Sequence, residues 1–502
     1  MSYTDEMADF LGDKEGLSFS ECTVCLCDQT VGHEVVKEIT LADYDPDIRR
    51  VLAVRETVFP PATYIGAGRA EFNGIAEYRL LCVTAEGRLC TVNASSEYEF
   101  QAPLEALSGE MDAEEGVCLF VSSDTDHVSA RLTAPRRIGL KHRISSRVRA
   151  YGAMTVGESF GGERMEGIQR LVSEGEQMVP FSMDSEPISF RDESPLPSVE
   201  SSVISAEATV FVSSAIPKDG AVGVSGEVYL KLLTDREGAA EVLARKIPFD
   251  GLIEGEGFSE NASVNATGVV ENMTVSAEEG RVSCEGDILL FGRSMRRVPL
   301  RYTEDLYAVG CETECEYREC EIPLAIRCEN RNLSQNEKIP LSEVRLPENA
   351  QILDIWGTAR AEGYERRGDR IVHTGKSRYW ILCEREGEYS VHEIELPLRY
   401  ETEMGDREPV AGDCAMQVIS CRARTDDETL HLDAEIAVSA DYVGSETIQW
   451  VSAVRKGETC EEKRPCMMVY YPTPEDTPWT VAKKYRIPQD QLEGDIGSYF
   501  FF

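Results

Sequence analysis

The sequence predicts an all-β protein, built of tandem antiparallel units like β-sandwiches and followed by a small α+β module at the C-terminus. Two observations predict this class. One pattern of turn residues and apolar residues occurs three times along the chain. Short runs of alternating apolar and polar residues, bounded by glycine, fill much of the rest, as is typical of antiparallel sheets. Apolar residues at every second position from Leu430 to Val438, for example, indicate a half-buried strand.

The repeated pattern centres on Gly74, Gly226 and Gly375, which lie 152 and 149 residues apart. Each glycine follows a small polar residue and precedes an apolar-rich quartet and then a Glu-Gly pair. The quartets are Tyr78-Arg79-Leu80-Leu81, Leu230-Lys231-Leu232-Leu233 and Tyr379-Trp380-Ile381-Leu382. Because glycine adopts positive φ without steric cost, Asn73-Gly74, Ser225-Gly226 and Thr374-Gly375 are predicted turns, and the Glu-Gly pairs are predicted to close hairpins.

The predicted domain organisation follows these copies. Apolar residues at helical spacing, from Met165 to Val172, predict a helix within 161–177, and a Ser/Pro/Glu-rich stretch after it predicts a linker. A second polar break is predicted at 328–338. The expected segments are an acidic leader (1–33), a first β unit (34–160), the helix and linker (161–197), a second β unit (198–323), a third β unit (339–455) and the terminal module (467–502).

Composition narrows the function classes. The chain has 502 residues, enough for three or four domains, and a formal charge of −39. Such a field repels nucleic acid and anionic lipid unless a local basic patch overrides it, so the expected partner is a basic or neutral surface or a neutral glycan, and no nucleic acid. No run of eighteen apolar residues occurs, and the N-terminus lacks the features of a signal peptide. We therefore expect no transmembrane segment and a protein that stays in the compartment where it is made.

The sixteen cysteines allow two interpretations. Cys22, Cys25 and Cys27 have the close spacing of a zinc site, and a second cluster, Cys311, Cys315, Cys320 and Cys328, could supply four thiolates. Neither cluster has two CxxC pairs at a ribbon spacing or a nearby histidine. The favoured interpretation is that these are small buried residues on strands, reduced in the newly made protein, with no bound metal and no cofactor.

A basic stripe stands out within this acidic chain. No acidic residue occurs between His127 and Gly157, and six basic residues of that segment form a possible contact stripe: Arg136, Arg137, Lys141, Arg143, Arg147 and Arg149. The stripe could bind a phosphate-bearing partner or a lipid headgroup. The alternative, which we rank first, is a basic strand that pairs with acidic neighbours across a sheet.

Enzyme signatures are missing from the sequence. The six histidines are scattered, and no zinc-protease, nucleophile-elbow, phosphate-loop or dinucleotide motif occurs. The sequence therefore predicts a non-catalytic protein with no catalytic residues.

The C-terminal segment from Val469 to Ile487 resembles the first half of a LysM module. In that module a strand leads into a loop ending in Asp-Thr, and a helix follows. Asp476 or Thr477 would cap this helix, whose first turn would hold Pro478 and Trp479. Glu475 replaces the usual glycine, and the second helix and closing strand of the module are expected to be largely missing. The predicted binding residues are Glu475, Asp476, Thr477, Trp479, Arg486 and Ile487.

Tandem β units followed by such a module resemble the SipL-type SPOCS-domain (spore-coat-associated) proteins of clostridial spore formers. The segment Glu38–Val54 carries the resemblance, and the motif copies and the basic stripe fit it. The resemblance implies a cytosolic protein of the mother cell that joins the spore coat to the forespore surface. It also implies that the LysM-like module docks on the coat's basement-layer ATPase or another coat protein.

The predicted function is therefore a scaffold or adaptor in spore coat assembly, acting through its C-terminal module. The alternative is an envelope protein that binds peptidoglycan or another N-acetylglucosamine glycan through the LysM-like part. At the sequence level Trp479 is the predicted hot spot for partner binding, and the module is expected to have a core separate from that of the β units.

Overall fold

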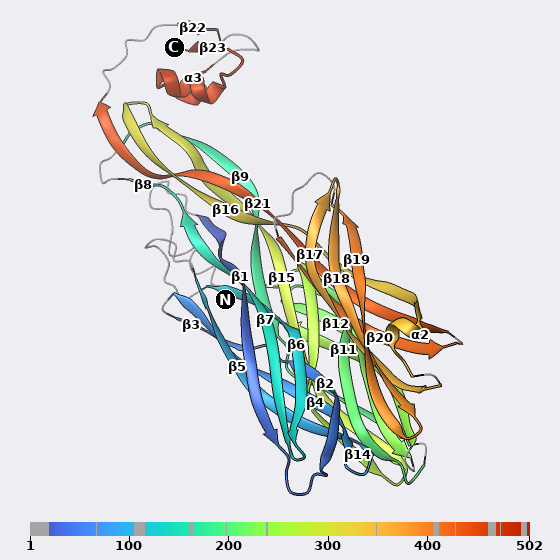
Figure 1. Cartoon of the computed structure of the whole chain (residues 1–502). Coiled ribbons are helices and arrows are strands. Elements are labelled where there is room, and N and C mark those ends of the chain that lie inside the picture. Colours follow the sequence, from blue (N-terminus) through green and yellow to red (C-terminus); the bar gives the residue numbers. More distant parts are fainter. Residues whose placement is uncertain are drawn as a thin grey trace.

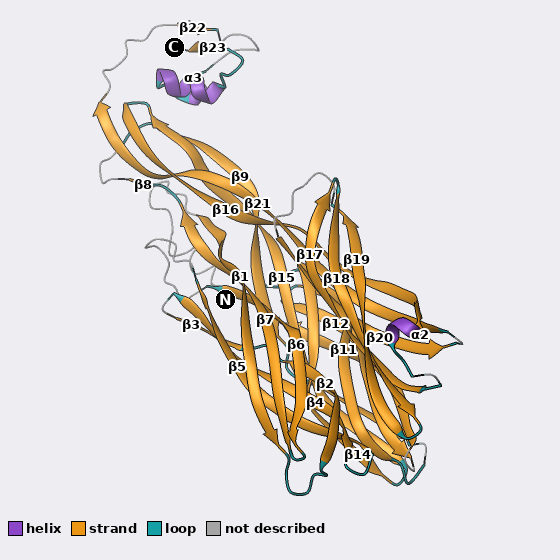
Figure 2. Cartoon of the chain, in the orientation of Figure 1, coloured by secondary structure: helices purple, strands orange, loops and turns teal. Residues whose placement is uncertain are grey.

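The computed structural model describes residues 20–66, 68–104, 116–160, 165–196, 198–236, 239–347, 349–404, 411–426, 428–459, 468–471, 473–492 and 499–501. Antiparallel strands make up nearly all of this part of the chain, so the all-β prediction is confirmed (Figure 2). Among the described residues, the helices are α2 (Leu341–Val344) and α3 (Pro478–Tyr485), with a 3-10 turn, η1 (Gln489–Gln491). None of the helices in these ranges is long and apolar enough to cross a membrane.

The first group of strands forms a two-sheet sandwich. One sheet has the order β1-β7-β6, and in the other β4 pairs with β2, β3 and β5. Buried faces of both sheets share one cluster that includes Cys22, Tyr78, Leu80 and Ile144. The strands are β1 (Ser20–Thr40), β2 (Ile48–Val58), β3 (Ala62–Gly66), β4 (Arg69–Thr84), β5 (Leu89–Pro103), β6 (Cys118–Ala134) and β7 (Arg137–Val156).

Two further groups of six strands repeat this pairing. Their sheets have the orders β10-β15-β14 and β11-β12-β13, then β16-β21-β20 and β17-β18-β19. The second group is β10 (Ile188–Pro195), β11 (Ser202–Lys218), β12 (Ala221–Arg236), β13 (Ala239–Glu254), β14 (Ser263–Glu278) and β15 (Arg281–Ala308). The third is β16 (Cys311–Pro340), β17 (Gln351–Arg367), β18 (Arg370–Arg385), β19 (Glu388–Glu403), β20 (Ala411–Thr425) and β21 (Thr429–Thr459). In each group, the first strand and the last two form one sheet, and the strands between them form the other.

Three long strands extend beyond their own sandwiches. The second half of β15 pairs with β9 (Ile168–Asp184), while β16 and β21 pair along their whole length. β8 (Ser159–Phe160) adds a short parallel pairing to β21. Figure 1 shows this extension reaching from the sandwiches toward α3, which lies beside the short strands β22 (Met468–Tyr470) and β23 (Tyr499–Phe501).

The turns predicted at Gly74, Gly226 and Gly375 are wrong, although the three glycines occupy matching places. Each is the sixth residue of a central strand, in β4, β12 and β18 respectively. A Cβ at Gly226 would lie 2.1 Å from the carbonyl oxygen of Phe211, and one at Gly375 would lie 2.2 Å from that of Arg360. In β11 and β17 a bulge brings the neighbouring backbone close at this point. Glycine is therefore required for close approach rather than for a turn.

The other turn prediction is confirmed where it can be followed. Glu86-Gly87 lies in the turn between β4 and β5, and Glu386-Gly387 forms the turn between β18 and β19. Both residues of the second pair have positive φ, 53° and 81°. Glu237-Gly238 lies outside the described residues.

The helix predicted within 161–177 is wrong, because residues from Ile168 onward form β9. Apolar residues on both faces of the first part of this strand are covered, so their spacing resembles that of a helix. Leu171 packs with the C-terminal module, and Ile168 packs against Leu306 and Val451 of the extension. The predicted linker contains β10, the break at 328–338 lies inside β16, and residues 20–33 of the predicted leader belong to β1. Residues 1–19 lie outside the described part.

The three middle sheets meet at a shared apolar junction. Leu81, Leu233 and Leu382, the last residues of the three quartets, belong to one buried cluster together with Trp356 and Tyr389. The preceding residues Leu80, Leu232 and Ile381 point the other way, into the sandwich interiors. The quartets are apolar at consecutive positions because their strands are buried on both faces.

Candidate functional site

The C-terminal module is built around α3. Thr477 is its N-cap: its hydroxyl accepts a hydrogen bond from the Thr480 amide (3.1 Å), and the Thr480 hydroxyl accepts one from the Thr477 amide (2.8 Å). Pro478 fills the first helical position, as predicted, and Arg486 ends the helix in the left-handed region. β22 pairs with β23, so this segment contains a second strand, although the sequence predicted that a closing strand would be largely missing.

Trp479 points into the protein rather than toward solvent. Its side chain is 6% exposed, its ring meets the Tyr307 ring edge-on with centroids 5.0 Å apart, and its Nε1 donates to Asp305 Oδ2 at 2.8 Å. Lys483, one turn later, donates to both Asp305 oxygens at 2.6 and 2.7 Å. The predicted hot spot is therefore an internal contact between α3 and the end of β15.

Arg486 and Ile487 strengthen the same contact. Arg486 forms an ion pair with Glu312 at 2.6 Å, and the Ile487 carbonyl accepts a hydrogen bond of 2.7 Å from the Tyr307 hydroxyl. Trp479, Ala482, Ile487 and Tyr307 form one cluster, which also contacts Leu171 and Val309. The expectation of a separate core for the module is wrong, since its core is completed by residues of β9 and the β15–β16 segment.

The other predicted residues shape the module's loop. Asp476 accepts hydrogen bonds from the Tyr470 hydroxyl and from both the amide and the hydroxyl of Thr473, between 2.7 and 2.9 Å. The Thr473 amide bond and the two hydroxyl bonds hold the pKa of Asp476 below its usual value. Glu475 is exposed beside it in the turn. Asp476 and Thr477 thus have local structural roles.

The module keeps an outward face that is open to solvent. Tyr470 faces inward, with its ring 5.6 Å from that of Tyr485, whereas its neighbours Val469 and Tyr471 are 39% and 75% exposed. This alternation is that of an extended segment with one covered face. Lys484 is also exposed, and its ammonium lies 5.3 Å from the Tyr470 ring centroid.

Asp305 is the functional residue that sequence reasoning missed. Burial alone would raise its pKa, but hydrogen bonds from Lys483, Trp479, Tyr317 and the Leu306 amide together lower it. One ionised carboxylate thus connects β15, β16 and α3. No sequence signal distinguishes Asp305 from the many other acidic residues of the chain. The position of its side chain depends on a bulge in β15 between Thr303 and Asp305.

The basic stripe lies along β7, and acidic side chains face it from neighbouring elements. Arg147 makes two bonds of 3.0 Å to Asp28 of β1, and Arg136 makes one of 2.8 Å to Asp47. Arg137, Lys141 and Arg143 lie 3.7–3.8 Å from Glu38, Glu34 and Asp126 respectively. Arg149 is buried. This geometry favours the structural interpretation, while a contact role for the stripe stays a prediction.

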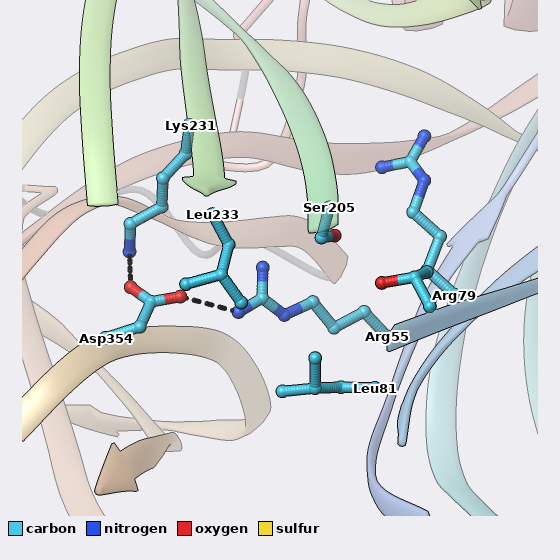
Figure 3. Close-up of a pocket in the computed structure, with 8 residues that line it drawn as sticks. Arg55, Arg79, Leu81, Ser205, Lys231, Leu233 and Asp354 are labelled. Atoms are coloured by element: carbon cyan, nitrogen blue, oxygen red, sulfur yellow. Dashed lines mark hydrogen bonds and ion pairs between the residues drawn. The ribbon is translucent and has the colours of Figure 1, made fainter. Parts of the chain in front are cut away.

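An ionic cluster lies at the junction of the three middle sheets (Figure 3). Arg55 of β2 forms ion pairs with Glu207 of β11 and, at 2.8 Å, with Asp354 of β17. Asp354 also pairs with Lys231 of β12, and the Arg55 guanidinium lies 3.9 Å from the centroid of the Trp356 ring. Each sandwich therefore supplies charges that are neutralised by another.

The cross-strand pairs at this junction occupy matching places. Arg55 pairs with Arg79, Glu207 with Lys231, and Trp356 with Trp380, and the second member of each pair follows the motif glycine by five residues. The three positions therefore carry different, complementary side chains. Such differences favour one arrangement of the three sandwiches over others that would bring like charges together.

A cavity of about 770 Å³ adjoins the junction and is lined by strands from all three sandwiches, among them β2, β6, β11, β17 and β20. Its lining carries both charge signs, including Glu56, Asp126, Glu207, Arg360 and Arg378. Burial, reinforced by the charge of Glu207, raises the pKa of Glu56 to about 7 against a hydrogen bond from Thr125.

The two cysteine clusters of the sequence come together through one residue of each. Cys22 of β1 and Cys320 of β16 have their sulfurs 3.7 Å apart, whereas Cys25 is exposed. Within the described ranges, no three His, Cys, Asp or Glu side chains are grouped in a way that could hold a metal ion.

Comparisons with protein-family models, with curated proteins and with solved structures give no match to this chain.

Proposed function

We propose that this chain is a non-catalytic scaffold in assembly of the spore envelope, which joins coat proteins to the forespore surface through its LysM-like C-terminal module. The resemblance of Glu38–Val54 and of the terminal segment to SPOCS-domain proteins is the starting point. The three groups of strands with one pairing order support a tandem repeat of such domains. On this proposal the protein acts in the cytosol of the mother cell.

One observation carries the proposal: the module is anchored at the end of the β9–β15–β16 extension by an ion pair, an indole hydrogen bond and a shared apolar cluster. A module that merely follows a linker would not need side chains of the β9–β15–β16 extension to complete its core. Anchoring holds the outward residues Val469 and Tyr471 in a fixed orientation, which lowers the entropy cost of binding. We assign the docking surface to this outward face rather than to Trp479.

The experiment compares capture of coat proteins by the purified chain and two variants. Tyr471→Ala truncates the most exposed aromatic of the outward face, and Ile216→Ala, an exposed residue of β11, is the matched control. The coat's basement-layer ATPase is the first candidate to be tested as a purified partner. We expect Tyr471→Ala to weaken capture by about tenfold or more, and Ile216→Ala to leave it unchanged.

A parallel arm uses purified peptidoglycan. Pelleting of the chain with peptidoglycan, lost in Tyr471→Ala, would instead support the alternative function in glycan binding. Equal capture of coat proteins by the chain and by a version ending at Lys463 would contradict any role of the module in docking.

A further inference from the structure

We propose that Cys22 and Cys320 form a disulfide bond when the folded protein meets a low-molecular-weight disulfide. Their sulfurs are 3.7 Å apart although the residues are separated by 298 positions in the chain. A disulfide has a sulfur–sulfur distance of about 2.05 Å, so the two atoms need to approach by less than about 2 Å. Rotations of the two side chains supply movements of this size.

The pair joins two sheets that backbone hydrogen bonds do not connect. Cys22 lies in β1, opposite Met154 of β7, and Cys320 lies in β16, opposite Ile448 of β21. Both belong to the apolar cluster in which the extension packs on the first sandwich, together with Leu300, Ile322 and Trp450. The bond would therefore link the first sandwich covalently to the strand that begins the third.

The environment gives the two thiols different roles. The hydrogen bond to Cys320, together with burial, raises the pKa of Cys22, while the same hydrogen bond lowers the pKa of Cys320. Cys22 is fully buried and Cys320 is partly exposed. Cys320 is accordingly the thiolate that meets the oxidant, and Cys22 is the resolving thiol.

The chemistry balances with a glutathione-type disulfide as the oxidant. The Cys320 thiolate attacks one sulfur of the oxidant, forms a mixed disulfide and releases one thiolate. Cys22 sulfur then attacks the Cys320 sulfur, the mixed disulfide breaks, and the Cys22 proton goes to the second departing thiolate. Two protein thiols are oxidised to one disulfide, and the oxidant is reduced to two small thiols.

The test treats the reduced, full-length protein with oxidised glutathione, alkylates the remaining thiols and maps linked peptides by mass spectrometry without reduction. The expected product is a Cys22–Cys320 peptide pair with Cys25 alkylated. Cys25→Ser should keep this product, and Cys320→Ser and Cys22→Ser should each abolish it. Because Cys22 is fully buried, Cys22→Ser could fail to fold; in that case the result with Cys320→Ser decides the test.

A second readout follows the melting temperature with and without the oxidant. A crosslink that closes so long a loop restricts the unfolded chain strongly, so oxidation should raise the melting temperature of the wild type and of Cys25→Ser but not that of Cys320→Ser. Recovery of Cys22 and Cys320 as separate alkylated or glutathionylated peptides would overturn the proposal. So would a bond from Cys22 to Cys25.

Discussion

At the scale of single residues, Arg55 is the side chain on which the junction depends most. Its guanidinium contacts acids from two other sandwiches and the face of Trp356, and its side chain is only 15% exposed. Removing one partner of a buried ionic group leaves the others without compensation, which costs far more than the loss of an exposed pair. The junction therefore owes its specificity to a few charges that no single sandwich could satisfy.

We expect Arg55→Ala to lower the free energy of unfolding by about 3–5 kcal/mol, because buried Asp354 and partly buried Glu207 would keep their charges with less compensation. The matched control is Arg49→Ala. Arg49 also lies in β2 and pairs with another sandwich through Glu388, but its side chain and that of Glu388 are 45% and 63% exposed. Arg49→Ala should lower the free energy of unfolding by at most about 1 kcal/mol. If urea unfolding showed equal losses of stability for Arg55→Ala and Arg49→Ala, the proposed importance of the buried ionic cluster would be contradicted.

Glu56 gives a prediction about pH. Its pKa is raised from 4.5 to about 7 in the folded protein, so the folded state holds a proton that the unfolded state releases. The free energy of unfolding should therefore fall as pH rises from about 4.5 to 7, by about 3 kcal/mol from this group. Glu56→Gln should remove that part of the slope. Urea unfolding at several pH values measures it, with exposed Glu97→Gln as the control; a wild-type slope in Glu56→Gln would refute the assignment.

At the scale of elements, Gly226 and Gly375 explain why their central strands tolerate a bulged neighbour. Gly226 lets the backbone of β11 approach β12, and an added Cβ would meet both the Phe211 carbonyl and the Phe249 ring. We expect Gly226→Ala to cost about 1–3 kcal/mol in unfolding free energy, because backbone must shift to make room. Gly175→Ala in β9, where a Cβ has open space, should be neutral. Comparable losses in both variants would contradict this explanation.

The contact between α3 and β15 is the second element-scale prediction. Asp305→Asn removes the charge that holds Lys483 and weakens the bond to the Trp479 indole. A hydrogen bond to a charged group contributes about 2 kcal/mol, so docking should weaken roughly 30-fold. Hydrogen exchange of the α3 amides should speed up accordingly, while Glu475→Gln, an exposed change in the same module, should leave it unaltered. If the α3 amides of Asp305→Asn exchanged at the wild-type rate, α3 would be stable without the contact to Asp305, which would contradict the prediction.

The sequence predicted some elements correctly for reasons that the structure makes clear. The quartets are strands, and Glu86-Gly87 and Glu386-Gly387 are hairpin turns. Both predictions are correct because the signals for them lie within a few residues of each element. The predictions at Gly74 and Ile168 are wrong. At Gly74 the Tyr98 ring of the neighbouring strand, which no local turn signal reveals, occupies the space of a Cβ. Ile168 packs on Leu306 and Val451, which are distant in sequence. At the candidate site, Thr477 could be identified as a cap from its own neighbours. The burial of Trp479 could not be predicted, since Asp305 and Tyr307 lie more than 170 positions away.

At the scale of the whole molecule, the sandwiches share cores rather than touching through thin interfaces. The junction cluster includes leucines from all three, and the core of the first sandwich includes Leu300, Ile322 and Trp450 from the extension. Domains joined by small polar interfaces move independently, whereas large apolar ones couple them. The three sandwiches should therefore behave as one rigid body that carries the C-terminal module at a fixed place.

Differential scanning calorimetry of the full chain, with and without Arg55→Ala, tests this coupling most directly. The shared cores predict one main transition for the three sandwiches, with Arg55→Ala lowering its midpoint by several degrees and leaving it undivided. Separate transitions, of which Arg55→Ala shifts only the one that belongs to the first sandwich, would contradict the account.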